Sequence, residues 1–172
     1  MKPPQWFEAI GIPEECVSKA SAAQEHGRRF SVAPRQEDQI WRVRLDGCWL
    51  QDEAEKRVDY LFWGQSASGR KVILLVELKG QDFGTALQQI ESTLLRLCKR
   101  VADNTVHMGK HQASPGHDSP RVGGVKAFVI LSKGVGVRQR LRQREALRQK
   151  YGVRVHTRER RLEVNGLDAL LS

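Results

Sequence analysis

The chain has 172 residues, of which 40% are hydrophobic, and this composition predicts one globular domain, residues 1–172, rather than a disordered segment. No apolar run reaches the roughly 20 residues that a membrane-spanning helix needs. The first residues, Met1–Trp6, lack the apolar core of a signal peptide, and we therefore expect a cytoplasmic protein. The net charge is +9, and it is not spread evenly along the chain.

The first predicted elements are a helix and a strand. Pro13–Glu25 carries acidic residues in its first turn, where the helix dipole favours them, and Gly27 follows its end. Apolar and mostly polar residues alternate over Gln39–Asp46, which predicts a half-buried strand.

Two further strands, Lys56–Trp63 and Lys71–Lys79, follow with a short turn at Gly64–Arg70 between them. We expect these three strands to form an antiparallel meander. The aliphatic run Val72–Val76 predicts a strand that is buried on both faces, at the centre of a sheet with helices on either side.

A long amphipathic helix is predicted over Phe83–Ala102, with Asp82 as its N-cap. A loop, Asn104–Gly124, leads to an apolar strand at Val125–Ser132. A strand, a crossover helix and a second strand predict a right-handed parallel βαβ unit.

The last predicted elements are a helix over Gln139–Tyr151, closed by Gly152, and a short strand at Val153–Thr157. The helix is expected to bury a stripe that includes Leu141 and Leu147. The order is therefore α-β-β-β-α-β-α-β, and we expect an α/β domain with a central mixed sheet flanked by helices.

Charged residues stand at the end of the most apolar strand. Glu77 and Lys79 are two residues apart, so on a strand their side chains point to the same face. If the neighbouring strand is antiparallel, Asp59 lies beside Glu77. Two carboxylates and one ammonium would then meet at one end of the sheet, where they are costly to desolvate unless they pair or bind a ligand.

This pattern resembles the PD-(D/E)XK nuclease superfamily, which has the restriction-endonuclease-like fold. The matching residues are Asp59, the tripeptide Glu77-Leu78-Lys79, and the helical Gln88-Gln89, and the resemblance covers roughly residues 38–132. The proline that usually precedes the aspartate is absent, because Val58 stands there.

The resemblance implies a metal-dependent nuclease that hydrolyses phosphodiester bonds in nucleic acid, with DNA as the expected substrate, in defence, repair or junction processing. Asp59, Glu77 and the Leu78 carbonyl would hold Mg²⁺ or Mn²⁺, which prefer oxygen ligands. Lys79 would act on the attacking water, and Gln89, with Gln88 as the alternative, would contact the phosphate or the water.

Many members of the superfamily add an acidic residue from the first helix. Glu25 is the first candidate here, with Glu14 and Glu15 as alternatives. Glu37 and Asp38, just ahead of the first strand, compete for the same role.

The positive charge is concentrated in the C-terminal third. Residues 121–161 hold 13 Lys/Arg and 2 Asp/Glu, a net charge of +11, so the rest of the chain is close to neutral. This imbalance indicates a polyanionic partner. The candidate nucleic-acid contacts are Lys133, Arg138, Arg140, Arg142 and Arg144.

Alternatives remain open at each step. The Glu77–Lys79 pair could be a purely structural ion pair. The domain could be a catalytically idle binding module for nucleic acid or a nucleotide, or a scaffold whose basic helix docks an acidic protein. A homodimer or a partner protein could supply target choice.

Two other kinds of site are weakly indicated or absent. His107 and His111 have a zinc-compatible spacing, but they lie with His117 in a segment rich in Gly and Pro. Cys16, Cys48 and Cys98 form no CxxC pair and are predicted to be reduced and buried. The chain contains no P-loop, dinucleotide-binding or nucleophile-elbow motif.

Overall fold

The computed structural model describes residues 2–50, 56–80, 82–108, 124–133 and 141–170. Their elements follow the chain in this order: α1 (Gln5–Ala9), η1 (Glu14–Cys16), β1 (Val17–Ser18), β2 (Ala22–Glu25), β3 (Arg28–Ala33), β4 (Gln39–Arg44), β5 (Tyr60–Gln65), β6 (Lys71–Glu77), α2 (Phe83–Met108), β7 (Val125–Leu131), α3 (Leu141–Tyr151), β8 (Arg154–Glu159), β9 (Arg161–Asn165) and η3 (Leu167–Leu170).

The strands form two sheets. The main sheet has the order β1-β4-β5-β6-β7-β8 and the small sheet has the order β2-β3-β9. In the main sheet β4, β5 and β6 pair antiparallel, whereas β6, β7 and β8 pair parallel. The predicted meander and the parallel βαβ pair are thus confirmed, and the domain is α/β with a mixed central sheet.

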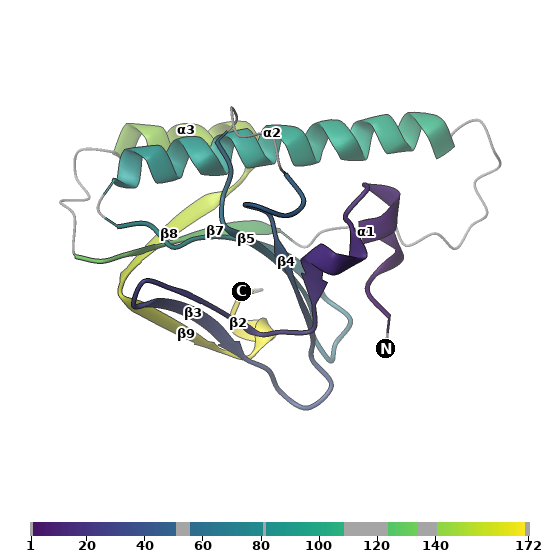
Figure 1. The fold of residues 1–172 in the computed structure, drawn as a ribbon, viewed down its shortest axis with the longest axis horizontal. Coiled ribbons are helices and arrows are strands. Elements are labelled where there is room, and N and C mark those ends of the chain that lie inside the picture. The colour runs from purple at the N-terminus through teal and green to yellow at the C-terminus, as the bar shows by residue number, and fades with distance from the viewer. Residues whose placement is uncertain (1, 51–55, 81, 109–123, 134–140, 171–172) are drawn as a thin grey trace.

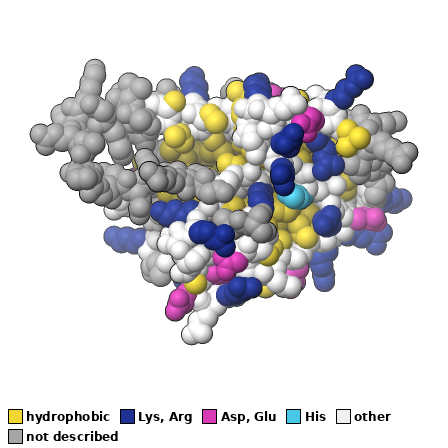
Figure 2. Space-filling model, turned by 180° about the vertical axis from the view of Figure 1, so that it is seen from behind, with side chains coloured by type: hydrophobic (Ala, Val, Ile, Leu, Met, Phe, Trp, Pro, Cys, Tyr) yellow, Lys and Arg dark blue, Asp and Glu magenta, His cyan; other side chains and the backbone are white. Residues whose placement is uncertain are grey.

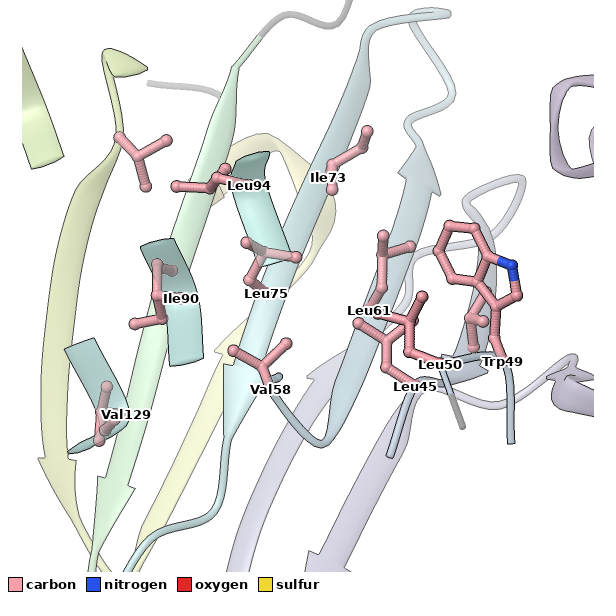
Figure 3. Close-up of a cluster of buried hydrophobic side chains, with 14 of the residues drawn as sticks. Leu45, Trp49, Leu50, Val58, Leu61, Ile73, Leu75, Ile90, Leu94 and Val129 are labelled. Atoms are coloured by element: carbon pink, nitrogen blue, oxygen red, sulfur yellow. The ribbon is translucent and has the colours of Figure 1, made fainter. Parts of the chain in front are cut away.

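Strand β6 shows how the layers are built, because its side chains alternate between two cores. Ile73 and Leu75 pack in the core beneath the helices, and Figure 3 shows them facing Ile90 and Leu94 of α2. Val72, Leu74 and Val76 pack in the second core, with residues of β3 and η3. Full burial of each of these aliphatic side chains contributes roughly 2 kcal/mol.

The two faces of the main sheet have different covers. Helices α2 and α3 lie side by side over one face, and the small sheet lies beneath the other (Figure 1). The expectation of helices on both sides is therefore wrong for the second face. There Phe30 packs on Phe62 and Phe128, with ring centroids 5.3 and 5.1 Å apart, so sheet-on-sheet contacts close the core.

Helix α2 begins where predicted. The Asp82 carboxylate accepts a hydrogen bond from the Thr85 amide at 3.0 Å, which is the N-cap interaction and stabilises a helix by about 1 kcal/mol. The helix extends to Met108, beyond the predicted end at Ala102, so the predicted loop begins later. The rest of that loop, with His111 and His117, lies outside the described residues.

The predicted helix over Pro13–Glu25 is wrong. Only Glu14–Cys16 forms a short 3-10 turn, and Ala22–Glu25 is strand β2. Strand β2 turns directly into β3 through His26 and Gly27, whose φ angles of 46° and 77° suit a two-residue hairpin turn. Pairing with β3 and burial of Ala23 override the helix propensity of this short segment.

The prediction for the cysteines is also wrong. Cys16 and Cys48 form a disulfide, with Cα atoms 5.6 Å apart although 32 residues separate them in sequence. The η1 turn packs in the same core as Trp49 and Leu50, which brings the two thiols together. Cys98 is the free cysteine of the described chain, and it is exposed on α2 rather than buried.

Helix α3 is described from Leu141 to Tyr151, where it ends as predicted, and it buries fewer apolar residues than expected. Leu147 is in the core as expected, but Leu141 is 57% exposed. Strand β9 and the turn η3 were not predicted. In the described part of the chain no helix is long and apolar enough to cross a membrane.

Candidate active site at the end of the central sheet

Asp59 and Glu77 lie next to each other where β5 begins and β6 ends. In the antiparallel register Tyr60 faces Val76, so Asp59, one residue before β5, comes beside Glu77, the last residue of β6. By strand alternation both residues belong to the same face as Leu61 and Leu75, the face that α2 covers.

A pair of reciprocal hydrogen bonds fixes the two carboxylates. The Asp59 amide donates to Glu77 Oε2 at 3.1 Å, and the Leu78 amide donates to Asp59 Oδ2 at 2.7 Å. One oxygen of each carboxylate is therefore held by the backbone. The other two oxygens, Asp59 Oδ1 and Glu77 Oε1, receive no backbone donor from the described residues.

Lys79 lies at the open side of this pair. Its Nζ is 3.7 Å from Glu77 Oε1, and its side chain is 31% exposed whereas that of Glu77 is 2% exposed. The ammonium thus stands between the buried carboxylate and solvent. At this distance the contact is a loose ion pair, longer than a charge-assisted hydrogen bond.

Both carboxyl groups are easier to protonate than usual. Burial raises the pKa of Asp59 to about 6, with the Glu25 charge adding to the shift and the Leu78 amide opposing it. Burial also raises the pKa of Glu77 to about 8, and the neighbouring Asp59 charge adds to that shift. Lys79 opposes both shifts without cancelling them. When both carboxyl groups are ionised, the site carries more negative charge than Lys79 neutralises.

Gln89 reaches the site from the second turn of α2. Its Nε2 donates to the Arg57 carbonyl at 2.6 Å, and its side-chain amide next to Glu77 opposes the rise of that pKa. Its Oε1 is buried and has no hydrogen-bond partner in the described structure. Gln88 is exposed instead, and its side chain contacts Lys56, so of the two glutamines Gln89 faces the carboxylates.

Thr93 is a buried residue that the sequence analysis missed. Its hydroxyl accepts from the Val58 amide at 3.1 Å and donates to the Gln89 carbonyl at 2.8 Å. It therefore joins the segment before Asp59 to the helix that carries Gln89. Its position four residues after Gln89, on the same helical face, is the sequence signal that could have revealed it.

The candidates for an additional acidic residue differ in where they lie relative to Asp59 and Glu77. Glu25 lies on β2, and its Oε1 accepts a hydrogen bond from the Tyr60 hydroxyl at 2.8 Å, next to Asp59. Glu14 and Glu15 are exposed in η1. Asp38 precedes Gln39, which pairs with Gln65 at the other end of β5, so neither Asp38 nor its neighbour Glu37 joins the site.

The residues present fit a hard divalent cation. Each carboxylate keeps one oxygen that no backbone amide of the described residues holds, and Gln89 Oε1 is a buried acceptor without a partner that could receive a water molecule. Among the described residues no cluster of three or more His, Cys, Asp or Glu side chains is present. Mg²⁺ keeps several of its waters, so two carboxylates are a sufficient protein contribution. Leu78 contributes its amide to the site, and the predicted role of its carbonyl stays a prediction.

The predicted nucleic-acid contacts are only partly described. Arg138 and Arg140 lie outside the described residues. Lys133 is exposed after β7, and Arg142 is exposed on α3. Arg144 uses one donor within the fold, because its Nη2 donates to the Val155 carbonyl at 2.6 Å.

The geometry thus defines a mixed α/β domain with an acidic pair, a lysine and a glutamine at one end of its central sheet. No family model, curated protein or solved structure matches this chain significantly.

Proposed function

We propose that this protein is a metal-dependent nuclease of the PD-(D/E)XK type, with a restriction-endonuclease-like topology, which hydrolyses phosphodiester bonds in DNA. The observation that carries the proposal is the convergence of Asp59 and Glu77, on neighbouring strands, beside Lys79. The chain order of β4, β5, β6, α2, β7, α3 and β8 also supports it, because this is the β-β-β-α-β-α-β succession of the nuclease core.

The uncompensated charge of the site argues for a cation rather than for a structural ion pair. A buried pair that only stabilised the fold would need close, well-directed contacts to offset desolvation. Glu77 is 1% exposed, yet its lysine is 3.7 Å away and its pKa is raised rather than lowered. A divalent cation between the carboxylates would remove this deficit.

Each residue has a distinct role in the proposal. Bound Mg²⁺ or Mn²⁺ would neutralise a phosphate oxygen and acidify a water. Asp59 and Glu77 would hold the cation with the oxygens that the backbone leaves available. Lys79, partly exposed, would contact the attacking water or the developing negative charge, and Gln89 would orient the water through its unpartnered Oε1.

The test is a cleavage assay on circular, linear, branched and single-stranded DNA and on RNA, with Mg²⁺, Mn²⁺ or EDTA. The variants are Asp59→Asn and Glu77→Gln, which keep an oxygen acceptor for the Leu78 and Asp59 amides and so preserve the local fold. Glu163→Gln, an exposed carboxylate on β9, is the matched control.

Metal-dependent cutting that disappears in the two site variants and persists in the control is the expected result. If the wild type cuts none of these substrates, or if cutting survives both site variants, the nuclease proposal is wrong.

A catalytically idle module that binds nucleic acid or a nucleotide is the second candidate. The uncompensated cations along β8, described below, favour it, because they would bind a polyanion whether or not the carboxylates hold a metal. It predicts salt-sensitive binding that survives Lys79→Ala, without metal-dependent cutting.

A homodimer or a partner protein that supplies target choice belongs to the proposal. The cytoplasmic location expected from the sequence does not, because the Cys16–Cys48 disulfide favours an oxidising compartment.

A further inference from the structure

The β7–β8 edge of the main sheet gathers positive charge on one face. In the parallel register Lys126 pairs with Arg154, Phe128 with His156 and Ile130 with Arg158, so these side chains share the face that the small sheet covers. Phe128 and Ile130 are buried beneath that cover. Arg154 and Arg158 are exposed and His156 is half-buried, which leaves a basic border along β8.

The two exposed arginines of this border lack acidic partners among the described residues. In the described part of the chain Arg154 and Arg158 form no ion pair, and Arg158 donates only to the neighbouring Thr157 carbonyl at 3.0 Å. Glu159, the carboxylate next to Arg158, projects to the opposite face by strand alternation. Glu163, on β9, is exposed and alternates with Leu162 and Val164, which pack toward the core.

The surroundings of His156 reflect this positive charge. Its ring stacks on Phe128, with centroids 5.1 Å apart, and its Nε2 is buried without a partner. Burial lowers its pKa, and the charges of Lys126, Arg158, Arg144 and Arg154 all lower it further. Like charges held this close destabilise the fold unless a polyanion neutralises them.

The border continues to the end of the sheet that carries the carboxylates. Arg160 is exposed in the β8–β9 turn, and its Nε donates to the Ser132 carbonyl at 3.4 Å. The Ser132 amide in turn donates to the Gly80 carbonyl at 2.8 Å, next to Lys79. A polyanionic strand that follows the exposed arginines from Arg154 to Arg160 would therefore pass around the end of the sheet and reach the candidate active site.

Helix α3 is also rich in arginine, but two of its cations form ion pairs. Arg148 pairs with Glu145 at 2.6 Å, and Lys150 pairs with Glu91 at 3.2 Å. Figure 2 shows a face on which Lys and Arg side chains surround one histidine, with few acidic side chains among them.

We propose that the β8 border, formed by Arg154, Arg158 and Arg160 beside His156, binds the phosphate backbone of nucleic acid and leads it to the carboxylate end of the sheet. This inference deepens the proposed function, on which it rests for the identity of the substrate. Exposed side chains on one face of a strand repeat roughly every 6.6 Å, so Arg154 and Arg158 offer separate phosphate contacts. Such contacts hold nucleic acid without reading its sequence.

The test is fluorescence anisotropy with a labelled DNA oligonucleotide in EDTA, at a series of salt concentrations. The double variant Arg154→Gln/Arg158→Gln removes two charges from the border. The matched control, Arg148→Gln/Lys150→Gln, removes two charges from α3. Thermal melts of all proteins verify folding.

The border variant is expected to weaken binding by at least about tenfold at low salt, and to lower the slope of log K against log salt by about 2, one for each lost phosphate contact. The control is expected to change the affinity by less than about twofold. An equal loss in both variants, a loss only in the control, or no salt-sensitive binding by the wild type would each overturn the proposal.

This assay contains no metal and requires no cutting. Failure of the nuclease proposal would therefore leave a positive binding result intact. Conversely, if the border variant binds DNA normally and still cuts it, the proposed role of the border is wrong and the nuclease proposal stands.

Discussion

The carboxylate end of the sheet and the β8 border both hold like charges together, but at different depths. Glu77 is 1% exposed and Asp59 is half-buried, whereas Arg154 and Arg158 are exposed. Burial destabilises the ionised form of both carboxyl groups, and it raises the pKa of Asp59 to about 6 and that of Glu77 to about 8. Exposure keeps the arginines charged at little cost.

The difference indicates which partner each region can accept. A small, dehydrated site with two oxygens suits a hard cation. An exposed row of cations suits an extended polyanion, whose affinity comes largely from released counterions. The following predictions separate the two regions, from the largest expected effect to the smallest.

Lys79→Met is expected to lower the cutting rate by on the order of 100- to 1,000-fold, because it removes the cation beside the reacting phosphate and keeps the apolar stem. Single-turnover cleavage of whichever substrate the wild type cuts is the measurement. Lys71→Met, at the other end of β6, is the control and should cut normally. A loss of DNA affinity in EDTA equal to the loss of rate would instead assign Lys79 to substrate binding.

Glu77→Gln is expected to change how stability depends on pH in the metal-free protein. The folded-state pKa values of about 6 and about 8 exceed the ordinary 3.8 and 4.5, so the folded protein binds more protons in this window. The free energy of unfolding therefore falls as pH rises from about 4 to about 8, by on the order of a few kcal/mol.

Urea denaturation in EDTA across this pH range measures the effect. The glutamine variant should show a clearly flatter profile than the wild type, and Mn²⁺ should stabilise the wild type most at high pH, where protons no longer compete. A wild-type stability that rises through the window would contradict the buried, uncompensated pair.

Thr93→Val is expected to destabilise the protein by about 1–3 kcal/mol, because the Val58 amide loses its buried acceptor at nearly constant volume. Chemical denaturation measures the change. Thr85→Val, in the partly exposed first turn of α2, should cost less than about 1 kcal/mol. Equal effects would mean that Thr93 does not support the carboxylate segment.

Arg148→Ala is expected to leave stability nearly unchanged, because its pair with Glu145 is exposed on α3 and screened by solvent. Thermal melts at low and high salt measure it. A strong loss of DNA binding by this variant would shift the polyanion site from the β8 border to α3.

The strand and helix positions nearest the site could be predicted from the sequence. The aliphatic run Val72–Val76 marks a buried strand, and the short turn before it makes an antiparallel neighbour almost unavoidable. That register alone places Asp59 beside Glu77. Gln89 follows from its place in the second turn of a helix with a clear period.

The small sheet could not be predicted in the same way. Ala22–Glu25 is short and has good helix formers, and it becomes a strand only because β3 pairs with it. Strand β3 in turn pairs with β9 from the far end of the chain. Such pairings depend on contacts that a local pattern does not contain. The same holds for the Cys16–Cys48 disulfide.

The sequence by itself determined the apolar strands, the long helix, the acidic and lysine residues at the sheet end, and the excess of positive charge in the last third. These features are local, because they depend on residue period and composition. Only the tertiary structure decided which charges are neutralised. Glu91 on α2 reaches Lys150 on α3, whereas no acid reaches Arg154 or Arg158 in the described chain. Charge compensation depends on distance and burial in space, and residue counts along a chain contain neither.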